Sequence, residues 1–220
     1  MLRFILLFLF ILGFVQAKAA LYFDKTGDEI NYLKSSLQNS KKGYVFSLEN
    51  ENFQIDIQTQ DKRVTMFKMI QQDEQKSIES FQKLSKVYVK YQEKNKVFKN
   101  LNFEISNHPW IQNFILLEEY MNGFPQRFEF LLFSIEELKF RNMILTKKEN
   151  ESINLEGIKL GSVKYALNVK GIPGFLWTAH IWLDAQTGEF LKYKGLAGGP
   201  GSPQKIFQKV FEKNTVKPYF

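Results

Sequence analysis

The chain has 220 residues, of which 44% are hydrophobic and 24% are charged, and its formal net charge at pH 7 is +7. This length is sufficient for one sizeable hydrophobic core, so we expect a single domain. The sequence contains no cysteine, which excludes disulfide bonds, a thiol nucleophile, cysteine-based metal sites and a cysteine-linked lipid anchor. The positive charge is spread over short clusters and is typical of a solvated strand face, because no lysine-rich or arginine-rich block is interleaved with stacking aromatics as nucleic-acid binding requires.

The first 19 residues have the form of a secretory signal peptide. Arg3 precedes an apolar run over residues 4–15, and the small residues that follow suit cleavage after Ala17 or after Ala19. At a rise of about 1.5 Å per residue, this run spans only about 18 Å of a hydrocarbon layer that is about 30 Å thick. We therefore expect no integral membrane span, and a mature domain over residues 20–220 that is located in the periplasm or secreted.

The mature chain begins with a predicted helix over residues 27–41. Thr26-Gly27-Asp28-Glu29 has the form of a capping box, and Ile30, Leu33 and Leu37 follow at helical spacing. The apolar stripe is narrow, so we expect this helix to lie on the surface of the domain.

Residues 43–105 alternate between apolar and polar side chains, which is the period of a half-buried strand. Polar turn segments separate the runs, which favours an antiparallel meander over strand–helix–strand units. The polar segment 71–76 is interpreted as an exposed loop or hairpin tip. The apolar positions of the runs are Tyr44/Phe46/Leu48, Phe53/Ile55/Ile57, Val64/Met66, Val87/Val89/Tyr91 and Val97/Leu101/Phe103.

A turn at His108-Pro109-Trp110 and a short predicted helix over residues 111–120 interrupt the meander. The strand that follows is apolar on both faces, because Phe128 and Phe130 share one face and Leu131 lies on the other. A strand that is covered on both faces packs against a second layer or against a ligand. The next strand repeats this pattern.

The strongest strand pattern comes later in the chain. Residues 163–169 and 177–184 alternate, and residues 190–193 return after a turn at Gly188. Three antiparallel strands are the minimum for a stable sheet, so we expect this unit to be the structural centre. Ser202-Pro203 then fits the N-cap and first residue of a last helix.

These elements predict a mainly β, α+β fold. We expect one curved antiparallel sheet or half-barrel of about 9–11 strands, with two or three helices packed on it.

Few residues point to catalysis. His108 and His180 have no second histidine or carboxylate at a metal-ligand spacing, and no G-x-S-x-G motif is present. The neighbouring carboxylates of Glu118-Glu119 and Glu136-Glu137 point in different directions and form no shared acid–base site. Residues 198–202 are glycine-rich but lack the G-K-[ST] of a P-loop, so they are interpreted as a helix cap. We expect neither an enzyme, nor a cofactor, nor a metal site.

The remaining signal is an excess of aromatic side chains, with 22 Phe, 9 Tyr and 3 Trp. If the second faces of the strands curve around a cavity, that cavity is apolar and suits an acyl chain, since about eight or nine buried methylenes contribute roughly 7 kcal/mol. The alternative is that the predicted helices fill the concave face. The candidate ligand-binding residues are Phe128, Phe130, Leu131, Trp177, Ile181 and Trp182.

Three motifs carry a resemblance to a known family: WTAHIWL at residues 177–183, FLKYKG at 190–195 and GPGSP at 199–203. They resemble the C-terminal signature of an uncharacterised family of exported bacterial proteins, which in turn looks like the Lol-type periplasmic lipoprotein carriers. The resemblance implies a strongly curved antiparallel half-barrel that wraps helices and accommodates acyl chains. It assigns no catalytic or binding residue.

We therefore predict an exported, non-enzymatic protein that binds a lipid or a lipidated partner in an apolar concavity, with a role in envelope lipid or lipoprotein transport. The alternative is an envelope assembly or structural factor that contacts a partner protein at its sheet edges. We expect no nucleic-acid partner.

Overall fold

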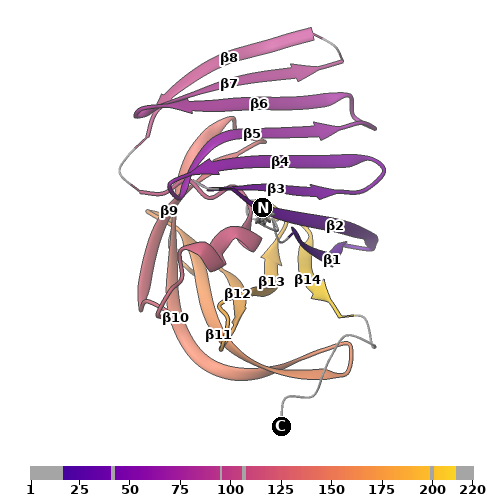
Figure 1. Cartoon of the computed structure of the whole chain (residues 1–220), viewed down its shortest axis with the longest axis vertical. Helices are drawn as coiled ribbons and strands as arrows, with labels where there is room; N and C mark the ends of the chain where they lie inside the picture. The colour runs from indigo at the N-terminus through magenta and orange to yellow at the C-terminus, as the bar shows by residue number, and fades with distance from the viewer. Residues whose placement is uncertain (1–16, 41–42, 95, 106–107, 199–200, 212–220) are drawn as a thin grey trace, which may run out of the picture.

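The computed structural model describes residues 17–40, 43–94, 96–105, 108–198 and 201–211 (Figure 1). Residues 1–16 of the predicted signal peptide, residues 199–200 of the glycine-rich segment and the C-terminal residues 212–220 lie outside this part of the chain.

The described residues form one antiparallel sheet of 14 strands. One short 3₁₀ helix, η1 (Phe114–Glu119), lies between β8 and β9 in this part of the chain. The strands are β1 (Ala17–Thr26), β2 (Glu29–Ser40), β3 (Gly43–Glu49), β4 (Phe53–Gln60), β5 (Arg63–Gln71), β6 (Lys76–Lys83), β7 (Lys86–Glu93), β8 (Lys96–Glu104), β9 (Arg127–Ser134), β10 (Lys139–Leu155), β11 (Ile158–Val169), β12 (Ala179–Asp184), β13 (Phe190–Leu196) and β14 (Gln204–Val210).

Each strand pairs with its neighbours in sequence, except that β8 does not pair with β9 and that β1 pairs in addition with β14. β1 pairs with β14, which brings the two ends of the described chain side by side, whereas β8 and β9 are the two edges of the sheet. The sheet is therefore rolled but not closed. Figure 1 shows its two halves, β1–β8 and β9–β14, on either side of the segment that contains η1.

Side-chain alternation places the core on the inner face of this rolled sheet. In β3, Tyr44, Phe46 and Leu48 are buried, whereas Val45 between them is exposed. The same period recurs in the neighbouring strands, where Ile57 and Phe67 are fully buried. Because most of these strands carry apolar side chains on one face and polar side chains on the other, the sheet bends to enclose its apolar face.

Strand β9 is covered on both faces, as its sequence pattern predicts. Phe130 contacts Phe114 of η1 edge-on, with ring centroids 6.5 Å apart. On the opposite face, Phe133 contacts Phe103 of β8 at 5.8 Å. The β9 edge therefore tucks inside the β8 end of the roll, so that η1 forms one covering layer and the β8 half of the sheet forms the other.

An aromatic cluster lies at the seam between the edge strands β8 and β9, which do not pair with each other. We call the cluster of Phe67, Phe103, Trp110, Phe133 and Phe140 the seam cluster. The Phe140 ring lies 5.4 Å from that of Phe103, 5.3 Å from that of Trp110 and 5.2 Å from that of Phe133. All three are edge-on or nearly edge-on, which is a favourable geometry for aromatic rings.

The edge of β9 is also satisfied by hydrogen bonds from the connecting segment. Leu131 N–H donates to the Pro109 carbonyl at 2.8 Å, and Ile111 N–H donates to the Leu131 carbonyl at 2.9 Å. One step further, the Gln112 side chain accepts from Phe133 N–H at 3.1 Å and donates to the Phe133 carbonyl at 3.0 Å. A side-chain amide thus takes the place of a strand partner where β8 is absent.

The predicted helix over residues 27–41 is wrong, because this segment is strand β2. Gly27 adopts φ +59 at the first central position of the two-residue turn between β1 and β2, where a hairpin turn requires glycine. Leu33 is buried, whereas Ile30 and Tyr32 are exposed. Apolar residues four apart in sequence share a face in a strand as well as in a helix, so Leu33 and Leu37 fit both periods.

The predicted last helix is also wrong, because residues 204–210 form strand β14. Phe207 is buried on the inner face, flanked by Lys205 and Lys209, whose ammonium groups lie 2.8 Å from Asp24 and 2.6 Å from Glu189. Because Lys205 and Lys209 point inward with Phe207, β14 lacks the alternation of apolar and polar residues that indicates a strand. Of the two or three expected helices, the described chain has the short η1 in place of the helix expected over residues 111–120.

The strand count exceeds the predicted 9–11, and one additional strand comes from the segment after residue 75. β6 carries few apolar residues, but Ile78 is fully buried and Ser80 is buried with it. Ser80 Oγ donates to the Phe67 carbonyl at 3.3 Å, which lets a polar residue occupy the inner face.

Candidate ligand-binding cavity

A cavity of about 550 Å³ lies between η1 and the β9–β14 half of the sheet. This volume is within the range of small-molecule sites, which is about 300–1,000 Å³. Its lining residues are Gln112, Phe114, Leu132, Phe133, Ser134, Ile135, Glu136, Glu137, Arg141, Met143, Val169, Ile172, Trp177, Tyr193, Leu196, Ala197, Gly198, Lys205 and Phe207. The connecting segment fills part of the concave face, and the cavity is the part that it leaves open.

The inner wall is aromatic and uncharged. Phe114 of η1 stacks on Tyr193 of β13, with ring centroids 5.4 Å apart and planes inclined by 17°. Burial raises the pKa of Tyr193 to about 12, so its phenol is neutral at physiological pH. Its hydroxyl donates to the Leu196 carbonyl at 2.8 Å, which leaves the ring face for apolar contact.

Trp177 closes one side of the cavity. It comes from the loop between β11 and β12, and its indole Nε1–H donates to the Gly198 carbonyl at 2.8 Å. The Gly198 segment belongs to the connection between β13 and β14. The hydrogen bond therefore fixes the orientation of the indole and joins two loops at the rim of the cavity.

The charged lining residues are mostly paired within the protein. Arg141 Nε donates to Glu137 at 2.6 Å, and this hydrogen bond lowers the pKa of Glu137. Lys205 is paired with Asp24 at 2.8 Å. Glu136 is exposed and makes no hydrogen bond or ion pair with any described residue. Among the described residues, the rim therefore has one unpaired carboxylate, that of Glu136, whereas its two cations, Arg141 and Lys205, are each paired with a carboxylate.

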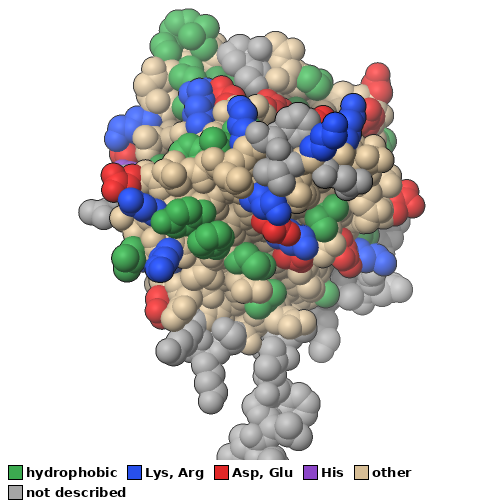
Figure 2. All heavy atoms as spheres, turned by 90° about the horizontal axis from the view of Figure 1, so that it is seen from above, with side chains coloured by type: hydrophobic (Ala, Val, Ile, Leu, Met, Phe, Trp, Pro, Cys, Tyr) green, Lys and Arg blue, Asp and Glu red, His purple; other side chains and the backbone are tan. Residues whose placement is uncertain are grey.

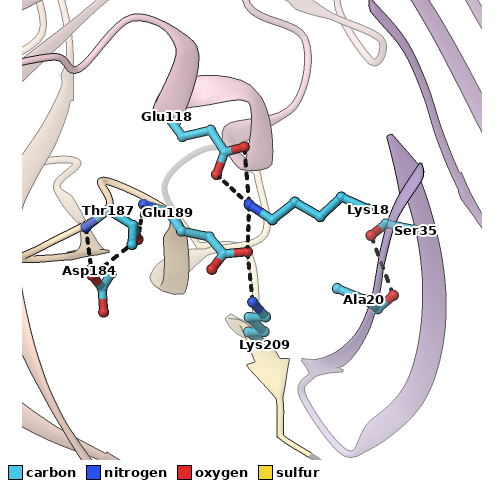
Figure 3. A network of polar contacts seen from close by, with 8 residues as sticks. All are labelled: Lys18, Ala20, Ser35, Glu118, Asp184, Thr187, Glu189 and Lys209. Carbon is cyan, nitrogen blue, oxygen red and sulfur yellow. Dashed lines mark hydrogen bonds and ion pairs between the residues drawn. The ribbon is translucent and has the colours of Figure 1, made fainter. Parts of the chain in front are cut away.

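A second polar group, centred on the half-exposed Lys18, lies outside the cavity lining (Figure 3). Lys18 Nζ of β1 lies 3.2 Å from Glu118 of η1 and 3.0 Å from Glu189, and Glu189 also accepts from Lys209 of β14 at 2.6 Å. Burial raises the pKa of Glu118. Burial also opposes ionisation of Glu189, but the hydrogen bonds and charges of Lys209 and Lys18 together outweigh it and lower the pKa of Glu189.

Of the six residues singled out from the sequence, Trp177 lines the cavity. Phe130 and Ile181 are fully buried in the main core, and Phe128 packs against that core at its edge. Leu131 lies on the other face of β9, bridged to Trp110. These four side chains lie outside the cavity lining.

Trp182 belongs to the opposite face of the sheet. It packs with Leu155 and Leu191 in a separate cluster, and its indole Nε1–H donates to Glu151 at 2.5 Å. Lys164 lies over its ring, 5.6 Å from the centroid. Alternation along β12 separates Ile181 from Trp182, but the sequence did not determine which parity faces inward.

The lining residues missed by sequence reasoning come from eight separate segments between residues 112 and 207. Phe114, Met143, Val169 and Tyr193 are apolar residues like many others in the chain. The strand parity of Met143, Val169 and Tyr193 can be read from the sequence, but their proximity to one another and to Phe114 arises from the roll of the sheet.

Several alternative site types find no support in the described residues. No group of three or more His, Asp or Glu side chains is arranged to hold a metal ion there. No helix in the described ranges is long enough and apolar enough to cross a bilayer. On the face seen in Figure 2, basic side chains are interspersed with acidic and hydrophobic ones.

No protein-family model and no curated protein matches the chain. Its structure is similar to the crystal structure of a β-barrel-like protein of the domain of unknown function DUF1849 from Brucella abortus, with a TM-score of 0.56, 13% sequence identity, and coverage of 89% of this chain and 96% of that one. The structure of the hypothetical lipoprotein YmcC from Escherichia coli aligns with a TM-score of 0.41 and 10% identity over 87% of this chain and 86% of that one. The resemblance to Lol-type carriers is not confirmed by these comparisons. The chain has a β-barrel-like fold that it shares with the DUF1849 protein.

Proposed function

We propose that this protein, after export, binds an acyl chain in the cavity between η1 and the β9–β14 half of the sheet. The carrying observation is the cavity of about 550 Å³ with an aromatic and aliphatic inner wall. The acyl chain belongs to a lipid or to a lipidated protein, and the protein's role is to hold it away from water during transport in the envelope.

The energetics of the wall favour an apolar ligand. The phenol of Tyr193, the indole of Trp177 and the amide of Gln112 all have hydrogen-bond partners within the protein. A polar ligand would have to compete with these bonds, whereas an acyl chain makes only apolar contacts. Each methylene that leaves water contributes about 0.8 kcal/mol, so about eight of them contribute roughly 6 kcal/mol before the entropy of immobilisation is subtracted.

The charges at the rim favour an uncharged or zwitterionic polar end over a free carboxylate. An anionic head group would need Arg141 or Lys205, and each is already paired with a carboxylate. It would also meet the exposed Glu136. An ester-linked or amide-linked acyl chain, as in a glycerolipid or an acylated protein, carries no such charge.

Native mass spectrometry of the protein purified from its own envelope fraction tests the proposal. We expect a co-purified acyl-bearing molecule, and in vitro a monoacylglycerol should bind more tightly than the free fatty acid of the same chain length. Val169→Phe adds a ring to the cavity wall and should reduce binding, whereas Val45→Phe makes the same change on the exposed face of β3. Equal binding by both variants, or no uptake by the wild type, would reject the proposal.

An assembly factor is the second candidate, favoured by the edge of β8. Among the described residues, only β7 pairs with β8 along its length, so its other side has strand hydrogen-bonding groups available for an added strand. Lys96 and Lys99 lie on this edge strand and are exposed, which discourages unspecific strand pairing. A stoichiometric protein partner in the same mass spectrum would favour this function.

A further inference from the structure

The β11–β12 loop, residues 170–178, places apolar side chains both inside and outside the protein. Ile172 and Trp177 line the cavity. Between them, Phe175 is 88% exposed and Leu176 is 50% exposed. Phe175 is the most exposed large hydrophobic residue among those described, and it lies two residues from a wall of the cavity.

The loop is held in place by its own hydrogen bonds. Leu176 N–H donates to the Pro173 carbonyl at 3.0 Å, which closes a turn with Phe175 at its tip. Thr178 Oγ1 lies 2.6 Å from the Gly174 carbonyl and 2.8 Å from Asn168 Oδ1. The exposure of Phe175 is therefore built into the fold of the loop.

We propose that the tip of this loop, Phe175 and Leu176, inserts into the surface of a lipid bilayer and positions the cavity for uptake of an acyl chain. This inference rests on the proposed function, because the uptake step requires that the cavity binds an acyl chain. An acyl chain that leaves a bilayer loses its apolar surroundings in water, so transfer requires the cavity to reach the membrane. The loop satisfies this requirement because the residues at its base form the cavity wall.

Co-sedimentation with phosphatidylcholine vesicles tests docking separately from ligand binding. We expect Phe175→Ser/Leu176→Ser to weaken vesicle binding at least about tenfold, since each side chain contributes by leaving water. The matched control is Phe81→Ser/Leu84→Ser, which removes the same two side chain types, 56% and 86% exposed, from β6 and the β6–β7 turn. This control should bind vesicles as the wild type does.

A second readout distinguishes failure of this inference from failure of the proposed function. The loop variant should take up a fluorescent acyl lipid from vesicles at least about tenfold more slowly, yet bind a monomeric short-chain acyl probe as tightly as the wild type. Unchanged vesicle binding, or equal losses in the loop and control variants, would overturn the docking role. Weaker binding of the monomeric probe would overturn it too, by making the tip part of the cavity. If vesicles bind through the loop but no probe binds, docking stands and the cavity function fails.

A second inference rests on a different observation, the position of Lys18. Its side chain is 51% exposed, and its ammonium group lies between the carboxylates of Glu118 and Glu189, which are both 17% exposed. The sequence allows cleavage of the predicted signal peptide after Ala17 or after Ala19. Cleavage after Ala19 would remove this cation and leave the two acids with Lys209 alone (Figure 3).

We infer that cleavage occurs after Ala17, so that Lys18 is the first residue of the mature protein. The intact mass of the protein recovered from the periplasm of a bacterial host should correspond to a start at Lys18. A start at Ala20 or at any other position, or an uncleaved chain, would overturn the inference. Chains produced without a leader provide a second check: one that begins at Ala20 should melt at a lower temperature than one that begins at Lys18, and Lys18→Met should reproduce most of the loss. Equal melting temperatures would remove the basis of the inference.

Discussion

Replacing Phe140 by alanine tests whether aromatic packing holds the rolled sheet at its unpaired seam. Phe140 contacts three other members of the seam cluster, Phe103, Trp110 and Phe133, at centroid distances of 5.4, 5.3 and 5.2 Å. These contacts connect β8 to β9 and β10, and neither of these two strands pairs with β8. Loss of the ring should therefore loosen the seam before it affects the centre of the sheet.

The expected loss follows from burial and geometry. A fully buried Phe→Ala substitution costs about 3–5 kcal/mol. Phe140 is half-buried, which reduces this term to about 2 kcal/mol, and three edge-on aromatic pairs add at least about 0.5 kcal/mol each beyond their buried area. We expect the free energy of unfolding to fall by about 3.5 kcal/mol and the melting temperature by about 7–14 °C for a domain of this size.

Urea unfolding measures the global loss, and amide hydrogen exchange locates it. Exchange should increase first in β8 and β9, with β12 protected as in the wild type. Phe175→Ala is the matched control, because the same ring is 88% exposed there and its loss should change stability by less than about 0.5 kcal/mol. A loss below about 1 kcal/mol for Phe140→Ala, or increased exchange spread evenly over the sheet, would refute aromatic closure of the seam.

Three further predictions concern packing, the ion pairs of Glu189 and pH. Gly195→Ala should reduce the free energy of unfolding by about 1–3 kcal/mol in urea, because the added Cβ would lie 2.4 Å from the Cβ of a β12 residue; an unchanged midpoint would contradict this. Glu189→Gln should cost about 2–3 kcal/mol in the same assay, since it removes the acid that accepts from Lys209 inside the roll, and a cost below about 0.5 kcal/mol would show that the network is solvated. Burial and the charge of Lys164 lower the pKa of His180 from its ordinary value of 6.5, so the folded state binds fewer protons and stability should fall as pH decreases through 6.5. His180→Gln should weaken that dependence between about pH 7 and pH 5, and an identical pH profile would argue against it.

Alternation predicted the strands whose outward side chains are polar. In β3, Val45 is an exposed apolar residue, but the outward positions Ser47 and Glu49 are polar, so the alternation still indicates a strand. In β9 the apolar residues on both parities predicted packing against a second layer or against a ligand, and η1 and the β8 half of the sheet cover its two faces. Local sequence was informative here because burial on each face follows from the side chain at that position alone.

Strands β2 and β14 were misassigned because their inner faces are partly polar. Lys205 and Lys209 point inward, where Asp24 and Glu189 neutralise them. Asp24 is far from Lys205 in sequence, so a window of neighbouring residues carries no sign of the pairing. Lysines two residues from Phe207 on either side therefore resemble the polar face of a helix, and only the pairing of β14 with β1 shows that they point inward.

The cavity was beyond local prediction for a related reason. Trp177 was recognised as an aromatic residue on a strong strand pattern, and it does lie at the cavity. Phe114 and Tyr193 stack on each other although η1 and β13 are far apart in the chain. Their meeting depends on where the connecting segment sits inside the roll, and this placement follows from the missing β8–β9 pairing.

The open seam and the cavity have a common structural origin. In a closed barrel, β8 and β9 would pair directly and a short turn would join them outside the sheet. Here the described part of the connection, residues 105 and 108–126, contains Gln112, whose side chain satisfies both backbone groups of Phe133 and also lines the cavity. The segment that replaces the missing strand partner therefore also sets the volume left for a ligand. Because Gln112 contacts both the edge of β9 and the cavity, a ligand that displaces the connecting segment must also disturb the seam. A ligand that moved Gln112 would break its hydrogen bonds to Phe133, and the binding of such a ligand would be linked to the stability of the β9 edge.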